Sequence, residues 1–426
     1  MIAKPALSIA LLCFSFTAQA QTKLTQEQQL GRLLYQDKNL STNRNQSCET
    51  CHALTGISHD ATSQSTPAFV DPQNSKNGTP VSLGSIPYAT GTLNAPSAGY
   101  AAFSPIFHWD ETEGLYVGGQ FWNGRAADLV AQAQKPFLNP VEMAMPNEWA
   151  VVSRLKENAR YARLFLNLYQ LDLNAVPHIK DALFQQQAPE VVSDIFQHAA
   201  QAIAAFEKSA EFNKFNSKFD YVMAGVTRFT ALERQGLALF NDEQKGNCAA
   251  CHPSNISTDD TGKKIPPLFT DFTYDNIGLP RNLNIPGTPE PDLGLGGRAD
   301  IRKIDPDRAE LGKHKVMSLR NIAITPPYGH NGVFATLEQI THFYNTRDTL
   351  AAVPDNRSPG FGISGWPKPE VGKNVNHDEL GDLGLTAAEE KAIVAFMKTL
   401  TDDYPEWGND PSVPPGTQSP FTVDIQ

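Results

Sequence analysis

The chain has 426 residues, of which 40% are hydrophobic and 19% are charged, a composition typical of a folded protein. It excludes a disordered chain, a coiled-coil rod and a single small module, and at ~100–200 residues per domain it predicts two or three domains. The formal charge of −11 makes nucleic acid a poor partner and favours proteins with a basic surface.

Residues 1–20 have the three parts of a secretory signal. Lys4 supplies the positive start, residues 6–16 the apolar stretch, and Ala-Gln-Ala at residues 18–20 the cleavage site. No later stretch has the ~18–20 consecutive apolar residues that a membrane span needs. We therefore expect an exported protein without a membrane span, whose mature chain begins near Gln21.

Cys13 is lost with the signal, and the four remaining cysteines lie in two C-x-x-C-H motifs. Disulfides, a zinc site and thioredoxin-like redox pairs are the alternatives for such cysteines. However, the motifs are about 200 residues apart, each has its own histidine, and no βαβ pattern accompanies them. C-x-x-C-H is the attachment sequence of haem c, in which two thioethers hold the porphyrin and the histidine binds the iron. We predict two covalent haems, attached at Cys48, Cys51, Cys248 and Cys251, with His52 and His252 as proximal ligands.

The segments that precede the two motifs resemble each other. Residues 30–35 and 235–240 share a Gly-x-x-Leu-aromatic frame with the spacing of an amphipathic helix. Further helical patterns lie at residues 148–169, 191–219 and 386–400, the last opening with a Thr-Ala-Ala-Glu capping box. The repeated frame predicts an internal duplication.

Two long segments, residues 53–119 and 253–297, are rich in Ser, Thr, Gly and Pro and show no periodicity. Long loops beside a cofactor often form pocket walls and docking surfaces. We therefore predict a mostly α protein with two cytochrome c-like haem domains and long loops. The N-terminal domain is expected at residues 21–225 and the C-terminal domain at residues 226–426, which include a Pro-rich tail.

Over nearly its whole mature length, the chain resembles the bacterial di-haem cytochrome c peroxidases and their relative MauG. The resemblance rests on both haem motifs and on further segments at residues 121–126, 136–143, 318–321, 327–332 and 385–400. It implies a periplasmic enzyme that reduces hydrogen peroxide at the N-terminal haem. The electrons would come from a small periplasmic donor, a cytochrome c or a cupredoxin.

The resemblance also implies roles for single residues. Trp122 matches the tryptophan that relays electrons between the haems, although a buried tryptophan is by default a core residue. Glu142 matches the distal acid, with Gln132 and Pro136 at matching positions. Peroxide cleavage needs a proton moved between its two oxygens, which a carboxyl can do. The alternative for Glu142 is a solvated helix end.

A calcium ion bridges the domains in members of the family. Asn94, Thr325 and Pro327 match its ligands, an asparagine from one domain and backbone carbonyls from the other. Hard oxygen ligands of this kind suit calcium.

The chain departs from the peroxidases at the second haem, where their distal ligand is methionine. Tyr344 stands at that position, as tyrosine does in MauG, and it shares one helical face with Leu337 and Ile340. A phenolate is a hard anionic donor that stabilises oxidised iron. His342 is the rival ligand but faces away on the helix, and Met397 lies on a core-forming face.

A second departure concerns the N-terminal haem, where many peroxidases carry a distal histidine. Residues 84–90 contain none, and the loop histidines nearby are His59 and His108. We expect an open peroxide site, as in MauG.

We therefore predict a periplasmic di-haem peroxidase. The main alternative is MauG-like oxidation of aromatic residues in a secreted partner protein. An electron carrier with two six-coordinate irons is disfavoured by the open first haem site.

Overall fold

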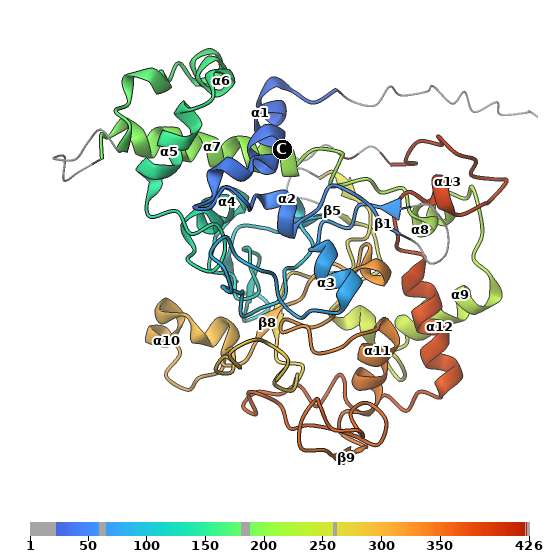
Figure 1. The fold of residues 1–426 in the computed structure, drawn as a ribbon. Coiled ribbons are helices and arrows are strands. Elements are labelled where there is room, and N and C mark those ends of the chain that lie inside the picture. The colour runs from blue at the N-terminus through green and yellow to red at the C-terminus, as the bar shows by residue number, and fades with distance from the viewer. Residues whose placement is uncertain (1–22, 59–64, 180–187, 259–261, 422, 424–426) are drawn as a thin grey trace, which may run out of the picture.

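The computed structural model describes residues 23–58, 65–179, 188–258, 262–421 and 423. The predicted signal at residues 1–20 and the loop histidine His59 lie outside these ranges. The regular structure is mainly helical, and the strands seen in the described ranges form only two-stranded sheets (Figure 1). The predicted mostly α class is confirmed. No helix in the described part of the chain is long and apolar enough to cross a membrane.

The first group of helices packs against the first haem motif, whose Cys48 touches their apolar cluster. It consists of α1 (Gln26–Gln36), α4 (Leu129–Leu138), α5 (Glu148–Lys156), α6 (Ala159–Tyr169) and α7 (Val191–Glu207). These helices share one buried apolar cluster, and α1 packs along α7.

Two helical patterns are interrupted in the structure. The predicted helix 148–169 is divided into α5 and α6 because the Asn158 side chain caps the second helix. The pattern over 191–219 stops at Glu207, where the Asn213 side chain binds the carbonyls of Glu207 and Ser209. Side-chain hydrogen bonds to the backbone thus end helices that the apolar periodicity alone would continue.

The second group of helices lies beside the first (Figure 1). It contains α8 (Lys218–Met223), α9 (Ala231–Phe240), α11 (Leu337–Thr346) and α12 (Ala387–Lys398). The predicted capping box at the start of α12 is confirmed, since Thr386 and Glu389 each bind the other's backbone N–H. Phenylalanines dominate the core of this second group. One of them, Phe219 in α8, comes before the predicted domain boundary at residue 225, so α8 packs with the domain that follows it.

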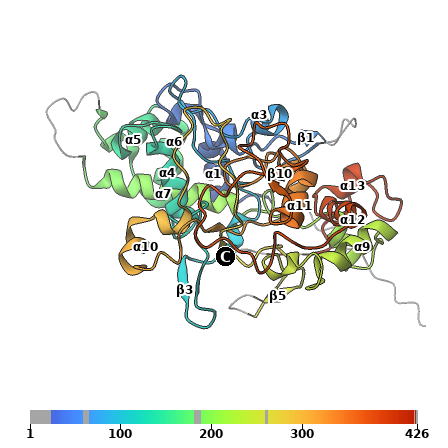
Figure 2. The same ribbon diagram turned by 90° about the horizontal axis from the view of Figure 1, so that it is seen from below.

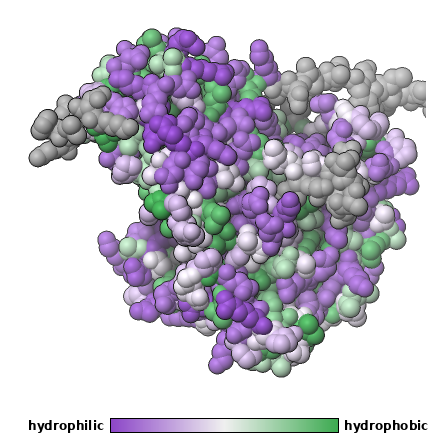
Figure 3. All heavy atoms as spheres, in the orientation of Figure 1, coloured by the Kyte–Doolittle hydropathy of each residue, from purple (hydrophilic) through white to green (hydrophobic). Residues whose placement is uncertain are grey.

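The remaining elements are short and stand in the long loops. The helices are α2 (Cys48–Cys51), α3 (Pro72–Asn77), α10 (Ala299–Ile304) and α13 (Tyr404–Trp407). Four pairs of strands are antiparallel. In the first half of the chain, β1 (Ile57–Ser58) pairs with β2 (Ser65–Thr66), and β3 (His108–Asp110) pairs with β4 (Leu115–Val117). In the second half, β5 (Ser257–Thr258) pairs with β6 (Lys264–Ile265), and β7 (Tyr274–Asp275) pairs with β8 (His314–Lys315). One parallel pair joins β9 (Ala351–Ala352) to β10 (Gly365–Trp366). Polar residues cover most of the face seen in Figure 3.

The same helix crossing occurs in both groups. At Gly31 of α1, an added Cβ would lie 1.8 Å from the Ala202 carbonyl oxygen of α7. At Gly236 of α9, it would lie 1.9 Å from the Ala392 carbonyl oxygen of α12. The glycine of each Gly-x-x-Leu-aromatic frame therefore lets two backbones touch. The matching crossings support the predicted internal duplication.

We expect Gly31→Ala and Gly236→Ala each to lower the free energy of unfolding by ~1–3 kcal/mol or more, because the new methyl group must push two helices apart. Urea unfolding measures the change. Gly372→Ala is the matched control, since nothing lies within 4 Å of its added Cβ. If all three variants had the same free energy of unfolding, the close approach of the helix backbones at Gly31 and Gly236 would be contradicted.

A buried ion pair holds the second group to the loops. The Arg320 guanidinium is 2.6 Å from Oδ2 of Asp220, and both side chains are fully buried. Arg320 also donates to the carbonyl of Pro267. These bonds join α8 to the segment around Pro267, which follows the second haem motif in the chain.

Candidate haem centres

The two C-x-x-C-H motifs have the same local geometry. Nδ1 of His52 donates to the carbonyl of Phe69 at 3.1 Å, and Nδ1 of His252 donates to the carbonyl of Phe269 at 2.7 Å. Each acceptor is 17 residues beyond its histidine. Since Nδ1 holds the proton, Nε2 keeps its lone pair, which is the tautomer that a metal ligand requires.

Further features suit both histidines to iron. Burial lowers the pKa of His52, and it lowers the pKa of His252 to about 4, so both rings are neutral at physiological pH. The acceptor residues Phe69 and Phe269 both have left-handed backbones, with φ of 53° and 54°. Such backbone strain in non-glycine residues concentrates at functional sites.

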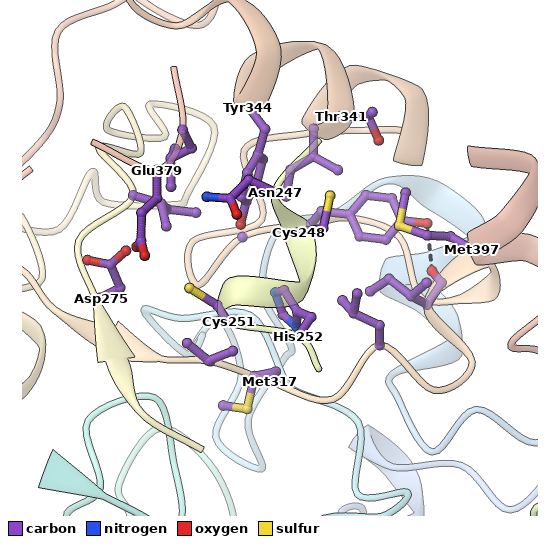
Figure 4. A pocket seen from close by; sticks show the side chains of 18 of the residues that line it. Asn247, Cys248, Cys251, His252, Asp275, Met317, Thr341, Tyr344, Glu379 and Met397 are labelled. Carbon is purple, nitrogen blue, oxygen red and sulfur yellow. Dashed lines mark hydrogen bonds between the residues drawn. The ribbon is translucent and has the colours of Figure 1, made fainter. Parts of the chain in front are cut away.

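A cavity of about 210 Å³ lies around the second motif (Figure 4). Cys248, Cys251 and His252 line it together with mainly apolar side chains. Burial raises the pKa of Cys248 to about 12, so its thiol is protonated, and neither cysteine forms a disulfide. Two free thiols, one neutral imidazole and apolar walls are the donor set of a haem c site.

Tyr344 enters this cavity from α11, on the side of the Cys248–Cys251 turn away from His252 (Figure 4). Burial, and next the Cys251 sulfur, raise the pKa of Tyr344 above its ordinary value. The phenol therefore keeps its proton unless a cation binds the oxygen.

The rival ligands lie differently. Nδ1 of His342 is 2.9 Å from a carboxylate oxygen of Glu390 on α12, and His342 does not line the cavity. Met397 does line it, and it also belongs to the second core. The structure thus brings Tyr344 and Met397 to the cavity and holds His342 outside.

Glu142 lies near the first motif. Burial is the main reason that the pKa values of Cys48 and Cys51 are raised, and the Glu142 carboxylate contributes to both. Burial also raises the pKa of Glu142 itself, against the opposing effects of the Arg125 guanidinium and of Asn139, whose Nδ2 donates to Oε1 at 2.5 Å. The carboxyl therefore holds its proton to a higher pH than an exposed glutamate does.

Gln132 lies half-buried on α4, the helix that leads into the turn containing Glu142. Pro136 stands in the last turn of the same helix, and its carbonyl accepts from the backbone N–H of Met143. The backbone carbonyl of Glu142 accepts in turn from Ser85 N–H at 2.6 Å. The loop of residues 84–90, which contains no histidine, thus packs beside Glu142. His108, the other loop histidine, is exposed on β3.

Trp122 lines the 210 Å³ cavity and also a second cavity of about 120 Å³. Its indole Nε1 donates to the carbonyl of Asn94 at 2.9 Å. Asn94, Thr325 and Pro327, the three residues predicted to bind calcium, all line the second cavity. Lys315 lines it too, and burial lowers the pKa of that amine to about 7.

Sequence reasoning missed a polar cluster beside Trp122. The rings of His314 and His330 stack with centroids 3.5 Å apart, and both residues line the larger cavity. Nε2 of His314 is 2.8 Å from Asp292, and Nε2 of His330 binds Glu370. His330 lies in one of the segments on which the family resemblance rests. However, no pattern in the sequence indicates that it lies close to His314, Asp292 and Glu370.

Glu207, the last residue of α7, is another buried acid near the first motif. It is 7% exposed, and burial raises its pKa to about 8. After burial, its charge is the largest cause of the raised pKa of Cys48.

We expect the stability of wild type to fall between pH 5 and pH 8 and that of Glu207→Gln to fall less. Relative to wild type, the variant should therefore be more stable at pH 8 than at pH 5. A glutamate in the unfolded chain loses its proton near pH ~4.3, whereas folded Glu207 keeps it up to about pH 8. Between these values the unfolded state binds fewer protons, so the free energy of unfolding falls by ~1.4 kcal/mol per pH unit as pH rises. Denaturant unfolding at both pH values checks this, with the half-exposed Glu211→Gln as control. Equal pH dependence in wild type and Glu207→Gln would contradict the raised pKa.

Comparison with known proteins agrees with this geometry. The family described as Di-haem cytochrome c peroxidase matches residues 25–228. Methylamine utilization protein MauG from Paracoccus denitrificans is 39% identical over 383 residues, which make up 88% of this chain and 88% of that protein. The chain belongs to the di-haem cytochrome c peroxidase and MauG family. It is therefore an oxidoreductase of a family whose cofactor is haem c.

Other members of the di-haem peroxidase family are also similar. Cytochrome c peroxidase Ccp from Escherichia coli is 30% identical over 72% of this chain and 50% of its own length. Among solved structures, a tyrosine-to-methionine variant of the di-haem peroxidase BthA from Burkholderia thailandensis has a TM-score of 0.70 and 28% identity, covering 89% of this chain and 86% of that one.

Proposed function

We propose that the protein is a periplasmic di-haem peroxidase that reduces hydrogen peroxide at its N-terminal haem and passes electrons between two haems. The observation that supports this most is the pair of equivalent histidines, each with Nδ1 on a backbone carbonyl and Nε2 left for iron. The two domains, expected to divide near residue 225, would instead divide just before α8, because Phe219 of that helix packs in the second core. The signal at residues 1–20 supports export to the periplasm.

The chain's own residues would hold both haems covalently. Cys48 and Cys51 would form the thioethers of the first and Cys248 and Cys251 those of the second, with His52 and His252 as proximal ligands. When bound, the haems supply the iron that accepts electrons and passes them to peroxide. Tyr344, which enters the 210 Å³ cavity around the second motif, is proposed as the distal ligand there.

Glu142 is proposed to move the proton that peroxide cleavage requires, with Gln132 nearby on α4. Its raised pKa supports this role, because a carboxyl that titrates closer to neutral pH exchanges protons more readily at that pH. Trp122 is proposed to relay electrons, since its ring lines the second haem cavity and the 120 Å³ cavity behind it. Calcium is proposed for the latter, held by Asn94, Thr325 and Pro327.

A second function is favoured by Tyr344 and by the similarity to MauG: peroxide-dependent oxidation of aromatic residues in a secreted partner protein. A phenolate ligand would stabilise oxidised iron and so prolong the oxidised enzyme. For the peroxidase, the partner would be a small cytochrome c or cupredoxin. The acidic chain favours a basic surface on either partner.

We expect two haems to remain attached to each chain after denaturing extraction, measured by a pyridine haemochrome assay. The two pairs of free cysteines beside neutral histidines are the reason. Replacing Cys48 and Cys51 by alanine should leave one haem, as should the same change at Cys248 and Cys251. A single haem or none in the wild type would overturn the proposal.

A further inference from the structure

The β3–β4 hairpin projects from the body of the protein next to α10 (Figure 2). It carries Trp109, whose side chain is 41% exposed. The chain has five tryptophans, all in the described ranges, and Trp109 is the exposed one. A large exposed indole on a projecting hairpin calls for a physical reason, because tryptophan usually buries its ring.

A continuous series of rings leads inward from Trp109. Its ring centroid is 4.9 Å from that of Tyr116, which stacks on Phe107 at 5.2 Å and an interplanar angle of 6°. Phe107 meets Tyr274 edge-on at 6.0 Å. All three separations fall in the ~4.5–7 Å range of aromatic contacts. We name Tyr274, Phe107, Tyr116 and Trp109 the aromatic chain.

The inner end of the aromatic chain lies one residue from the wall of the second haem centre. Tyr274 lies in β7 directly before Asp275, which lines the 210 Å³ cavity. Sγ of Cys251 and carboxylate oxygens of Asp275 and Glu379 all lie within 4.8 Å of one another. The rings thus run from the molecular surface to Tyr274, which is one residue along β7 from the cavity wall.

The surroundings hold the inner rings in place. The Tyr274 hydroxyl donates to the carbonyl of Gly118 at 2.5 Å, and the Arg298 guanidinium lies 4.2 Å from the Phe107 centroid. Gly124, two residues after Trp122, has φ of 67°, and an added Cβ there would lie 2.2 Å from the Tyr274 hydroxyl oxygen. The loop that carries Trp122 therefore touches the aromatic chain directly.

We propose that the aromatic chain carries single electrons between the second haem centre and the surface, and that Trp109 marks the docking site of a protein electron donor. This inference rests on the proposed peroxidase function. Indole and phenol rings are among the side chains that lose an electron most readily, so Trp109, Tyr116 and Tyr274 can each hold the charge in turn. The Phe107 ring only bridges Tyr116 and Tyr274, with which it is in contact. Two donor molecules each lose one electron, and peroxide takes up both with two protons to form two waters.

The charge of the hairpin indicates the donor's surface. Residues 108–117 include Asp110, Glu111 and Glu113 and contain no lysine or arginine. Glu111 and Glu113 are exposed beside the indole. A donor with a basic surface would be steered to this point, and its redox group would come close to Trp109.

The first experiment maps oxidation in the holoprotein treated with hydrogen peroxide without a donor. Peptide mass spectrometry should find oxidised Trp109 well above the half-buried Trp407, and Tyr116→Leu should reduce it to the Trp407 level. Tyr88, which is 99% exposed but outside the aromatic chain, serves as the surface control in the same digest. Oxidation that follows exposure alone, or that Tyr116→Leu leaves unchanged, would overturn the inference.

The second experiment uses a reduced basic c-type cytochrome as donor. Glu111→Lys with Glu113→Lys should lower its second-order rate of oxidation by ~10-fold or more at low salt, and less at high salt. Trp109→Phe should slow oxidation of this donor, while the reaction with peroxide alone keeps its wild-type rate. If the wild type does not react with peroxide, the proposed function itself fails. If the wild type reacts with peroxide but the Glu111→Lys/Glu113→Lys and Trp109→Phe variants oxidise the donor at the wild-type rate, the proposed function stands and the docking site at Trp109 is overturned.

Discussion

Glu142→Gln is expected to slow the reaction with hydrogen peroxide by ~10²–10⁴-fold, the usual contribution of a positioned acid or base. Glutamine keeps the size of the side chain and can keep a hydrogen bond with Asn139, but it cannot take up and return a proton. The resting haem spectrum should stay nearly unchanged, because Glu142 is not a proposed ligand. Stopped-flow mixing with peroxide measures the rate. An unaltered rate would assign Glu142 a structural role.

The pH dependence gives a sharper test of the same residue. Glu142 must be deprotonated to accept the first proton of peroxide, and burial raises its pKa above the ordinary glutamate value. The rate should therefore fall as pH drops through this raised pKa, at a higher pH than for an exposed glutamate. Glu142→Gln should lose that part of the profile. Glu157→Gln, an exposed acid paired with Arg44, should keep it.

Sequence periodicity predicts the helices well where one apolar face decides the fold. The frames at residues 30–35 and 235–240 fall in α1 and α9, and their glycines lie at matching helix crossings. The same periodicity does not show where a helix stops. The break before α6 depends on one asparagine that caps it, which competes with a continuous apolar pattern.

The candidate haem centres are predictable to the extent that their residues are neighbours in sequence. C-x-x-C-H places three groups within five positions, and the spacing on α11 correctly separates Tyr344 from His342. The acceptors Phe69 and Phe269 lie 17 residues away in loops, where no pattern marks them. The stacked pair of His314 and His330 arises from tertiary packing, which a single sequence does not reveal.

The largest change at the second centre is expected from Tyr344→Met. If the Tyr344 oxygen binds the iron, methionine would replace a hard anionic donor by a soft neutral one. Axial ligands set haem potentials over ~0.8 V, so the potential of this haem should rise by a few tenths of a volt. The oxidised enzyme formed with peroxide should also decay faster, because no phenolate remains to offset positive charge. Turnover with a small cytochrome should be kept or improved.

Control variants separate ligation from packing at this position. Tyr344→Phe keeps the ring but loses the oxygen, so it should shift the potential and leave the second haem attached. His342→Ala should change neither the potential nor the decay, because His342 pairs with Glu390 outside the cavity. Met397→Leu keeps an apolar side chain in the core and should likewise leave both unchanged. Redox titration and stopped-flow spectra of the four variants decide the ligand. If Tyr344→Met matches the wild type while Met397→Leu shifts the potential, the thioether of Met397 is the ligand and the enzyme uses its second haem as the methionine-ligated peroxidases do.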